Sequence, residues 1–169
     1  MRPSGYINTP ITRGGSAPDD PRYFTWDIIA GNDSIFTSGT CAINDGKNID
    51  IDFGQIPEWH LSASAAASRY QRRVNVPYRC KSPVSMPIKI TLSADASPFS
   101  DSAIMTSNQN LGVEMYYENQ QIKPGDSIRT ELQSGLGSSD LNFVLVKKSS
   151  VAVSKGPFNG SAVLVMSAD

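Results

Sequence analysis

The last residues of the chain constrain its fold more than any other segment. Residues 162–166 are apolar without a break, which is typical of a strand buried on both faces. The chain ends three residues later, at Asp169. Such a strand needs a hydrogen-bonded neighbour on each side, because a long apolar strand with an open edge aggregates. We therefore expect another molecule to supply a neighbour that this chain lacks. The alternative is that the strand pairs with an internal strand as an ordinary core element.

Length and charge narrow the class of protein. The 169 residues suit one domain of about 130 residues with an extension. Only 18% of residues are charged and the formal net charge is −1, so no strong field favours nucleic acid or an acidic membrane. No apolar run approaches the roughly 18 residues of a membrane span. Residues 1–5 lack the apolar segment of a signal peptide, so we expect any export signal to be absent from this chain.

The chain has two cysteines, Cys41 and Cys80, which lie far apart in the sequence. Their spacing fits neither a zinc site nor a redox Cys-x-x-Cys motif, and their even count predicts one structural disulfide. A disulfide indicates an oxidising compartment. The alternative is a pair of buried free thiols in a cytosolic protein.

The hydrophobic pattern predicts an antiparallel β-sandwich. Residues 1–22 contain four prolines and three glycines and are expected to form a tail or linker. Ile49, Ile51 and Phe53 alternate with Asp50 and Asp52, as in a half-buried strand. Residues 61–68 fit either helical turns or a flexible connection, and residues 134–139 are expected to form a loop. The remaining predicted strands cover residues 23–29, 34–37, 73–80, 87–93, 115–122, 127–132, 141–147 and the terminal segment.

With its strands placed, residues 37–169 resemble the pilin domains of bacterial chaperone–usher fimbriae. The similarity rests on motifs in a fixed order: Cys41, Asp52-Phe53-Gly54, Val76-Pro-Tyr before Cys80, Ala103 to Asn108, Leu111 to Met115, and Ile122-Lys-Pro-Gly125. It ends with a glycine fourteenth from the C-terminus, here Gly156, and alternating apolar residues in the last strand. The penultimate residue, usually aromatic in the family, is Ala168.

The resemblance implies an immunoglobulin-like sandwich that lacks its seventh strand, leaving a hydrophobic groove beside the last strand. A periplasmic chaperone, and then the N-terminal extension of the next subunit, would fill that groove by strand addition. It also implies an outer-membrane usher as a partner and a place in a fimbrium on the cell surface, reached through the periplasm. No cofactor, metal or nucleic acid is implied. The groove residues are expected to be Gly156, Phe158, Ala162, Leu164, Met166 and Ala168.

Residues 1–36 decide the kind of subunit. Phe24, Trp26 and Ile28, followed by Gly31, form an alternating pattern that suits a donor strand. A minor or adaptor pilin requires such a strand. Alternatively, residues 1–36 are a linker from a receptor-binding domain, and the chain is the pilin half of a tip adhesin.

Enzymatic chemistry has little support in the sequence. The only histidine, His60, would have to serve any Ser-His or Cys-His mechanism. Asp50 and Asp52 are better explained as a solvated strand face than as a metal site or a carboxylate pair. The basic residues between Arg69 and Lys81 are expected to form a solvated edge. The remaining alternative is a secreted carbohydrate-binding sandwich with Trp59 and Tyr116 as a sugar platform.

Overall fold

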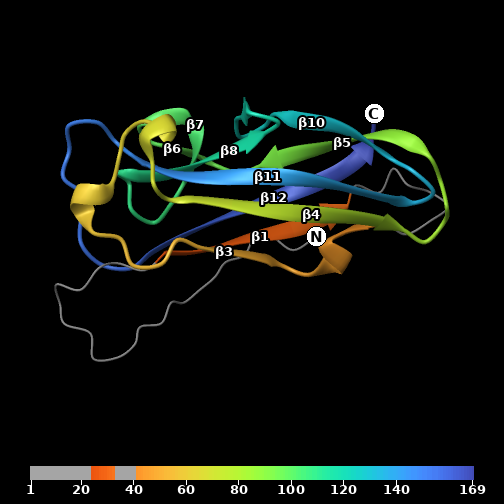
Figure 1. The fold of residues 1–169 in the computed structure, drawn as a ribbon, viewed down its shortest axis with the longest axis horizontal. Coiled ribbons are helices and arrows are strands. Elements are labelled where there is room, and N and C mark those ends of the chain that lie inside the picture. Colours follow the sequence, from red (N-terminus) through yellow and green to blue (C-terminus); the bar gives the residue numbers. More distant parts are fainter. Residues whose placement is uncertain (1–23, 33–40) are drawn as a thin grey trace.

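The computed structural model of the protein describes residues 24–32, as backbone, and residues 41–169 in full. The described part is built from strands, with only short 3-10 turns, and the strands form two packed sheets (Figure 1). The predicted β-sandwich is therefore confirmed. No helix in the described ranges is long and apolar enough to cross a membrane.

The first sheet has five strands in the order β10-β5-β12-β1-β3. These are β10 (Ser127–Leu132), β5 (Met86–Ser93), β12 (Phe158–Ala168), β1 (Phe24–Asn32) and β3 (Ile49–Asp52). Every neighbouring pair is antiparallel except β1 and β12, which are parallel.

The second sheet has seven strands, with β9 paired to β8 beside the main order β2-β4-β11-β8-β7-β6. The strands are β2 (Cys41–Ile43), β4 (Gln71–Cys80), β11 (Leu136–Lys147), β8 (Leu111–Tyr117), β9 (Gln120–Ile122), β7 (Ser100–Met105) and β6 (Ala96–Ser97). Three 3-10 turns lie in the connections: η1 (Asn44–Gly46), η2 (Glu58–His60) and η3 (Ala65–Ala67).

One continuous apolar core fills the space between the sheets. It joins inward residues of both sheets, among them Ile90 and Leu164 of the first and Tyr78 and Phe143 of the second. The predicted alternation of residues 49–53 is confirmed, since Ile49, Ile51 and Phe53 are buried while the two aspartates are exposed.

Two predicted elements were wrong. The single strand expected at residues 115–122 is the hairpin of β8 and β9, which turns at Glu118 and Asn119, both with positive φ. A two-residue turn with both φ values positive matches the twist of the flanking strands. The loop expected at 134–139 is mostly the start of β11, because only Ser134 and Gly135 are needed for the turn after β10. Residues 61–68, left open by the sequence, contain the short turn η3.

Candidate functional site

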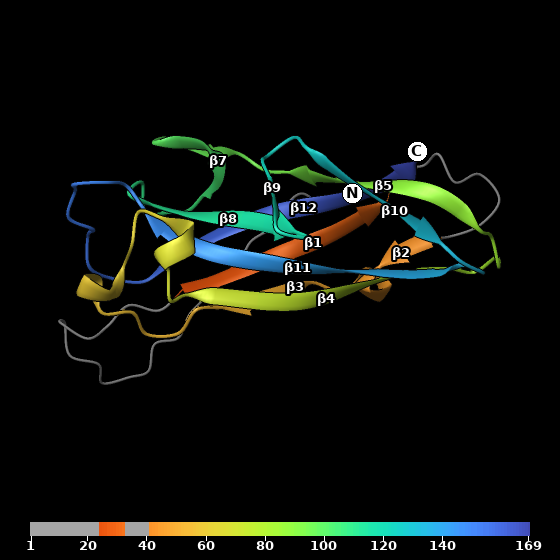
Figure 2. The ribbon, with the colours of Figure 1, turned by 45° about the horizontal axis from the view of Figure 1, so that its top comes forward.

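The last strand, β12, has both of its neighbours within this chain. It lies between β5, with six register pairs, and β1, with nine register pairs from Phe24 beside Phe158 to Asn32 beside Met166. Figure 2 shows β1 between β12 and β3. The expectation that another molecule must supply the second neighbour is therefore wrong for this state. The reason is that a segment expected to be an extension supplies the strand itself.

We call the space between β12 and β3, occupied here by β1, the groove. Its two rims run in opposite directions, because β1 is parallel to β12 and antiparallel to β3. The rims also differ in length: β12 offers nine register pairs and β3 offers four. Without β1, these rims would be open edges and would require another strand.

The predicted groove residues lie on or just before β12. Phe158, Ala162, Leu164 and Met166 are buried in the core, with Leu164 and Met166 at 0% exposure. The intervening Val163 and Val165 are half-buried, as expected from strand alternation. Ala168 is half-buried at the end of the strand. Gly156 precedes the strand with φ +120°, in the region that favours glycine.

The beginning of β12 is fixed to the second sheet. Thr106 and Gly160 form an isolated bridge, and the Ser107 backbone N–H donates to the Asn159 carbonyl oxygen at 2.7 Å. The Ser107 hydroxyl in turn accepts the Asn159 N–H at 3.0 Å. These contacts hold one end of the longer rim in place.

Arg72 supports the shorter rim, and the sequence analysis missed this role. It was grouped with basic residues expected to be solvated. Its guanidinium instead donates to the carbonyl oxygens of Asp52 at 2.9 Å and Phe53 at 3.2 Å, where β3 ends. The same group lies 5.5 Å from the centre of the Phe53 ring, within cation–π range. The one signal in the sequence is strand alternation, because Arg72 falls on the same face of β4 as Val74 and Val76, whereas Arg73 falls on the exposed face.

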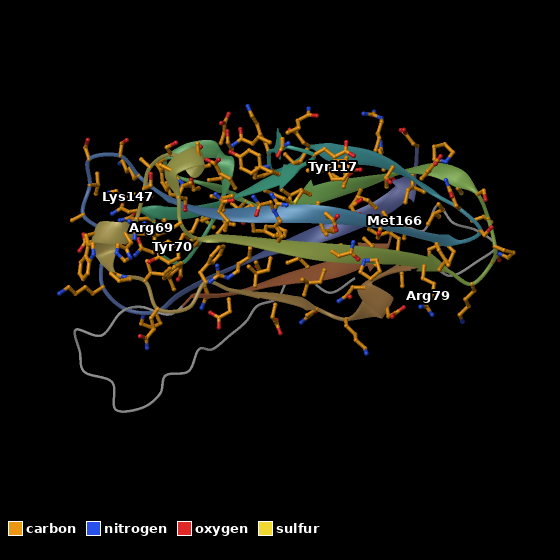
Figure 3. All side chains as sticks on the ribbon, viewed as in Figure 1. Arg69, Tyr70, Arg79, Tyr117, Lys147 and Met166 are labelled. Atoms are coloured by element: carbon orange, nitrogen blue, oxygen red, sulfur yellow. A yellow bond between two sulfur atoms is a disulfide. The ribbon has the colours of Figure 1, made fainter. Side chains whose placement is uncertain are left out.

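The disulfide lies at the opposite end of the domain from the start of β12. Cys41 and Cys80 are bonded, with a Cα–Cα distance of 3.9 Å, and are register partners in β2 and β4. Figure 3 labels Arg79, the neighbour of Cys80, at this end and Arg69 and Tyr70 at the other. The predicted disulfide is present.

The residues considered for metal binding, catalysis or sugar binding lie in the following places. Within residues 41–169 no cluster of three metal-ligating side chains occurs. His60 Nδ1 lies 3.1 Å from the Tyr70 hydroxyl, which gives the ring a structural contact. A hollow of about 650 Å³ on the second sheet is lined by Tyr116 and Arg73, and Trp59 is not among its lining residues.

Two tyrosines have perturbed acidity. Burial raises the pKa of Tyr78 to about 12. Burial also raises the pKa of Tyr116 to about 12, and the hydrogen bond from its hydroxyl to Glu114 adds to that shift. Both groups are therefore neutral at physiological pH, and neither is poised for acid–base catalysis.

Comparison with known proteins identifies the family. The family model for fimbrial proteins matches residues 32–169. No curated protein sequence matches. In structure the chain is similar to the P pilus rod subunit PapA, with a TM-score of 0.57 and 17% identity over 70% of this chain and 91% of that one. It is also similar to a chain of a chaperone–usher pilus solved to explain rod uncoiling, with a TM-score of 0.58 and 14% identity over the full length of both.

These findings establish that the protein has the immunoglobulin-like pilin fold. The chain belongs to the fimbrial protein family. It is a structural subunit of a cell-surface pilus, assembled with other subunits, and not an enzyme.

Proposed function

We propose that the chain is an interior subunit of a chaperone–usher fimbria, of the minor or adaptor kind, that joins its neighbours by donor-strand exchange. The observation that carries this proposal is that β1 occupies the groove between β12 and β3. The chain thus has both a groove and a segment that fits one. An interior subunit needs both, since it accepts a strand from one neighbour and donates a strand to the other.

The direction of β1 supports replacement by an outside strand. Any strand in the groove is parallel to one rim and antiparallel to the other, because the rims oppose each other. Parallel pairing is slightly less stable per residue than antiparallel pairing. In the described state the nine pairs with β12 are parallel and the four pairs with β3 are antiparallel. A donor strand in the reverse direction would pair antiparallel with β12, so the more stable kind of pairing would form along the rim that offers nine pairs.

The short connection to β2 favours the parallel direction for the chain's own strand. Asn32 lies beside Met166, towards the end of the domain where Cys41 begins β2. Reversing β1 would move Asn32 to the far end of a nine-residue strand, about 26 Å away. The nine residue steps from Asn32 to Cys41 span at most about 30–32 Å fully extended, which leaves little length for the turn that a reversal needs. A donor strand from another molecule is free of this restriction.

Assembly partners follow from this proposal. A periplasmic chaperone would occupy the groove before export, and an outer-membrane usher would pass the subunit to the surface pilus. The segment Phe24–Asn32, with Phe24, Trp26, Ile28 and Gly31, would be the strand that this subunit donates. Adhesion would come from the assembled fibre rather than from a site on this chain.

A peptide-rescue experiment tests the proposal. Ile28→Pro removes a backbone donor from β1 and should lower the thermal midpoint of the full chain. A peptide of residues 24–32 should restore that midpoint in proportion to RT ln(1 + [L]/Kd), about 2.7 kcal/mol at a hundred times Kd. A scrambled peptide should not. Equal rescue by both peptides, or no effect of the proline, would show that the groove does not recognise this strand.

A further inference from the structure

The two most exposed large apolar side chains of the described residues lie at opposite ends of the domain. Trp59 is 82% exposed and Leu136 is 56% exposed. Trp59 belongs to η2, the golden turn at one end of Figure 1, and Leu136 begins β11 at the other. Single exposed apolar residues are common, but tryptophan is highly buried on average. An exposed pair at the two ends suits a head-to-tail contact.

Trp59 is presented by an anchored turn beside the start of β12. The Glu58 carboxylate accepts the Val153 backbone N–H at 3.2 Å, which ties η2 to the segment leading into β12. His60, on the other side, contacts the Tyr70 hydroxyl, and its ring meets the Trp59 ring edge-on at 5.5 Å. A fixed backbone lowers the entropy lost when the indole is buried against a partner.

Leu136 is presented by a turn that is equally well anchored. Gly135 accepts the Cys80 backbone N–H at 2.8 Å and donates its own N–H to the Val84 carbonyl oxygen at 2.7 Å. Leu136 is the register partner of Arg79, which forms an exposed ion pair with Asp45 at 3.7 Å. This end therefore offers an apolar side chain with a charged rim, next to the point where β2 begins.

We propose that the Trp59 end of one subunit packs against the Leu136 end of a second copy of this chain. The inference rests on the proposed function, because a donor strand antiparallel to β12 leaves the groove where β12 begins, at the Trp59 end. From there residues 33–40 lead to Cys41 of the donor, which lies at the donor's Leu136 end. The short connection thus brings these two ends together. A donor parallel to β12 would instead join two Leu136 ends.

Hydroxyl-radical footprinting of the unmodified full chain tests the contact. Trp59 and Leu136 should react strongly in the monomer and should both be protected several-fold in polymers. Tyr116, in the hollow of the second sheet, should keep its reactivity and serves as the internal control. Polymers in which Trp59 and Leu136 remain as reactive as in the monomer would overturn the proposal.

Cross-linking identifies which ends meet. Chains carrying Trp59→Cys and chains carrying Leu136→Cys are mixed, polymerised and treated with a short bismaleimide. Cross-links between the two variants are expected, and Arg73→Cys, on an exposed side of β4, should cross-link with neither. Cross-links only between two Leu136→Cys chains would overturn the proposal while leaving strand exchange intact. Failure of every mixture and of the unmodified chain to polymerise would overturn the contact between two copies, whereas the proposed function is refuted separately if the peptide of residues 24–32 fails to rescue the Ile28→Pro variant.

Discussion

Removing the disulfide should destabilise the domain by about 4 kcal/mol. The two cysteines are 39 positions apart, and the loop-closure relation gives an unfolded-state entropy loss of about 13 cal/mol/K for a loop of that size. At 25 °C this equals about 4 kcal/mol, a large share of the 5–15 kcal/mol that stabilises a typical domain. The bond also holds β2, a strand of three residues whose one partner among the described strands is β4.

The assay is denaturant unfolding of the oxidised protein, the reduced protein and the Cys41→Ala/Cys80→Ala variant. Alanine is chosen because both positions are buried, at 4% and 7% exposure, and serine would add an unsatisfied hydroxyl. The reduced and doubly substituted proteins should lose similar stability. Two free thiols in the denatured, unreduced protein would refute the bond, and a loss below about 1 kcal/mol would refute the loop-closure reasoning.

Three further predictions concern single residues. Leu164→Ala should lower the free energy of unfolding in urea by about 3–5 kcal/mol, because the side chain is fully buried. Val163→Ala, on the half-buried face of the same strand, should lower it by less than half as much. Equal losses would contradict the packing of β12. Gly135→Ala places a Cβ 2.6 Å from the Ser82 carbonyl oxygen and should lower the thermal midpoint more than Gly125→Ala does. Gly125 is the matched control, because it also has a positive φ but has no atom within 4 Å of the added Cβ. Thermal midpoints that fall equally would show that only backbone strain matters. The folded pKa of Tyr78 is raised to about 12, so its hydroxyl stays protonated in the folded chain at pH values where it already ionises in the unfolded chain. The free energy of unfolding is therefore unaffected by Tyr78 below pH 10 and falls between pH 10 and 12, by up to about 3 kcal/mol. Tyr78→Phe should flatten that alkaline loss, and an unchanged alkaline profile would contradict the assignment.

Strand alternation made much of the fold predictable. Residues 49–53 and the terminal strand have strong alternating or continuous apolar patterns, and such patterns reflect burial directly. The hairpin at residues 118–119 was missed because Glu and Asn are not the Asn-Gly or Asp-Gly pair that marks a tight turn. The start of β11 was missed because glycine and serine at 134–139 favour loops locally, while pairing with β4 favours a strand.

The groove was predictable only in part. The apolar terminal segment indicated that β12 needs two neighbours, but no local pattern says whether the second comes from the same chain. That outcome depends on the reach of residues 33–40 and on the relative stability of two ladders. The role of Arg72 was hidden for a similar reason, because its partners at Asp52 and Phe53 are distant in sequence.

An electron-microscopy reconstruction of the polymer formed by the full chain would test the central claim most directly. The strand between β12 and β3 should come from the neighbouring subunit and run antiparallel to β12. A reconstruction in which each groove holds the subunit's own residues 24–32, still parallel to β12, would contradict strand exchange as the means of assembly.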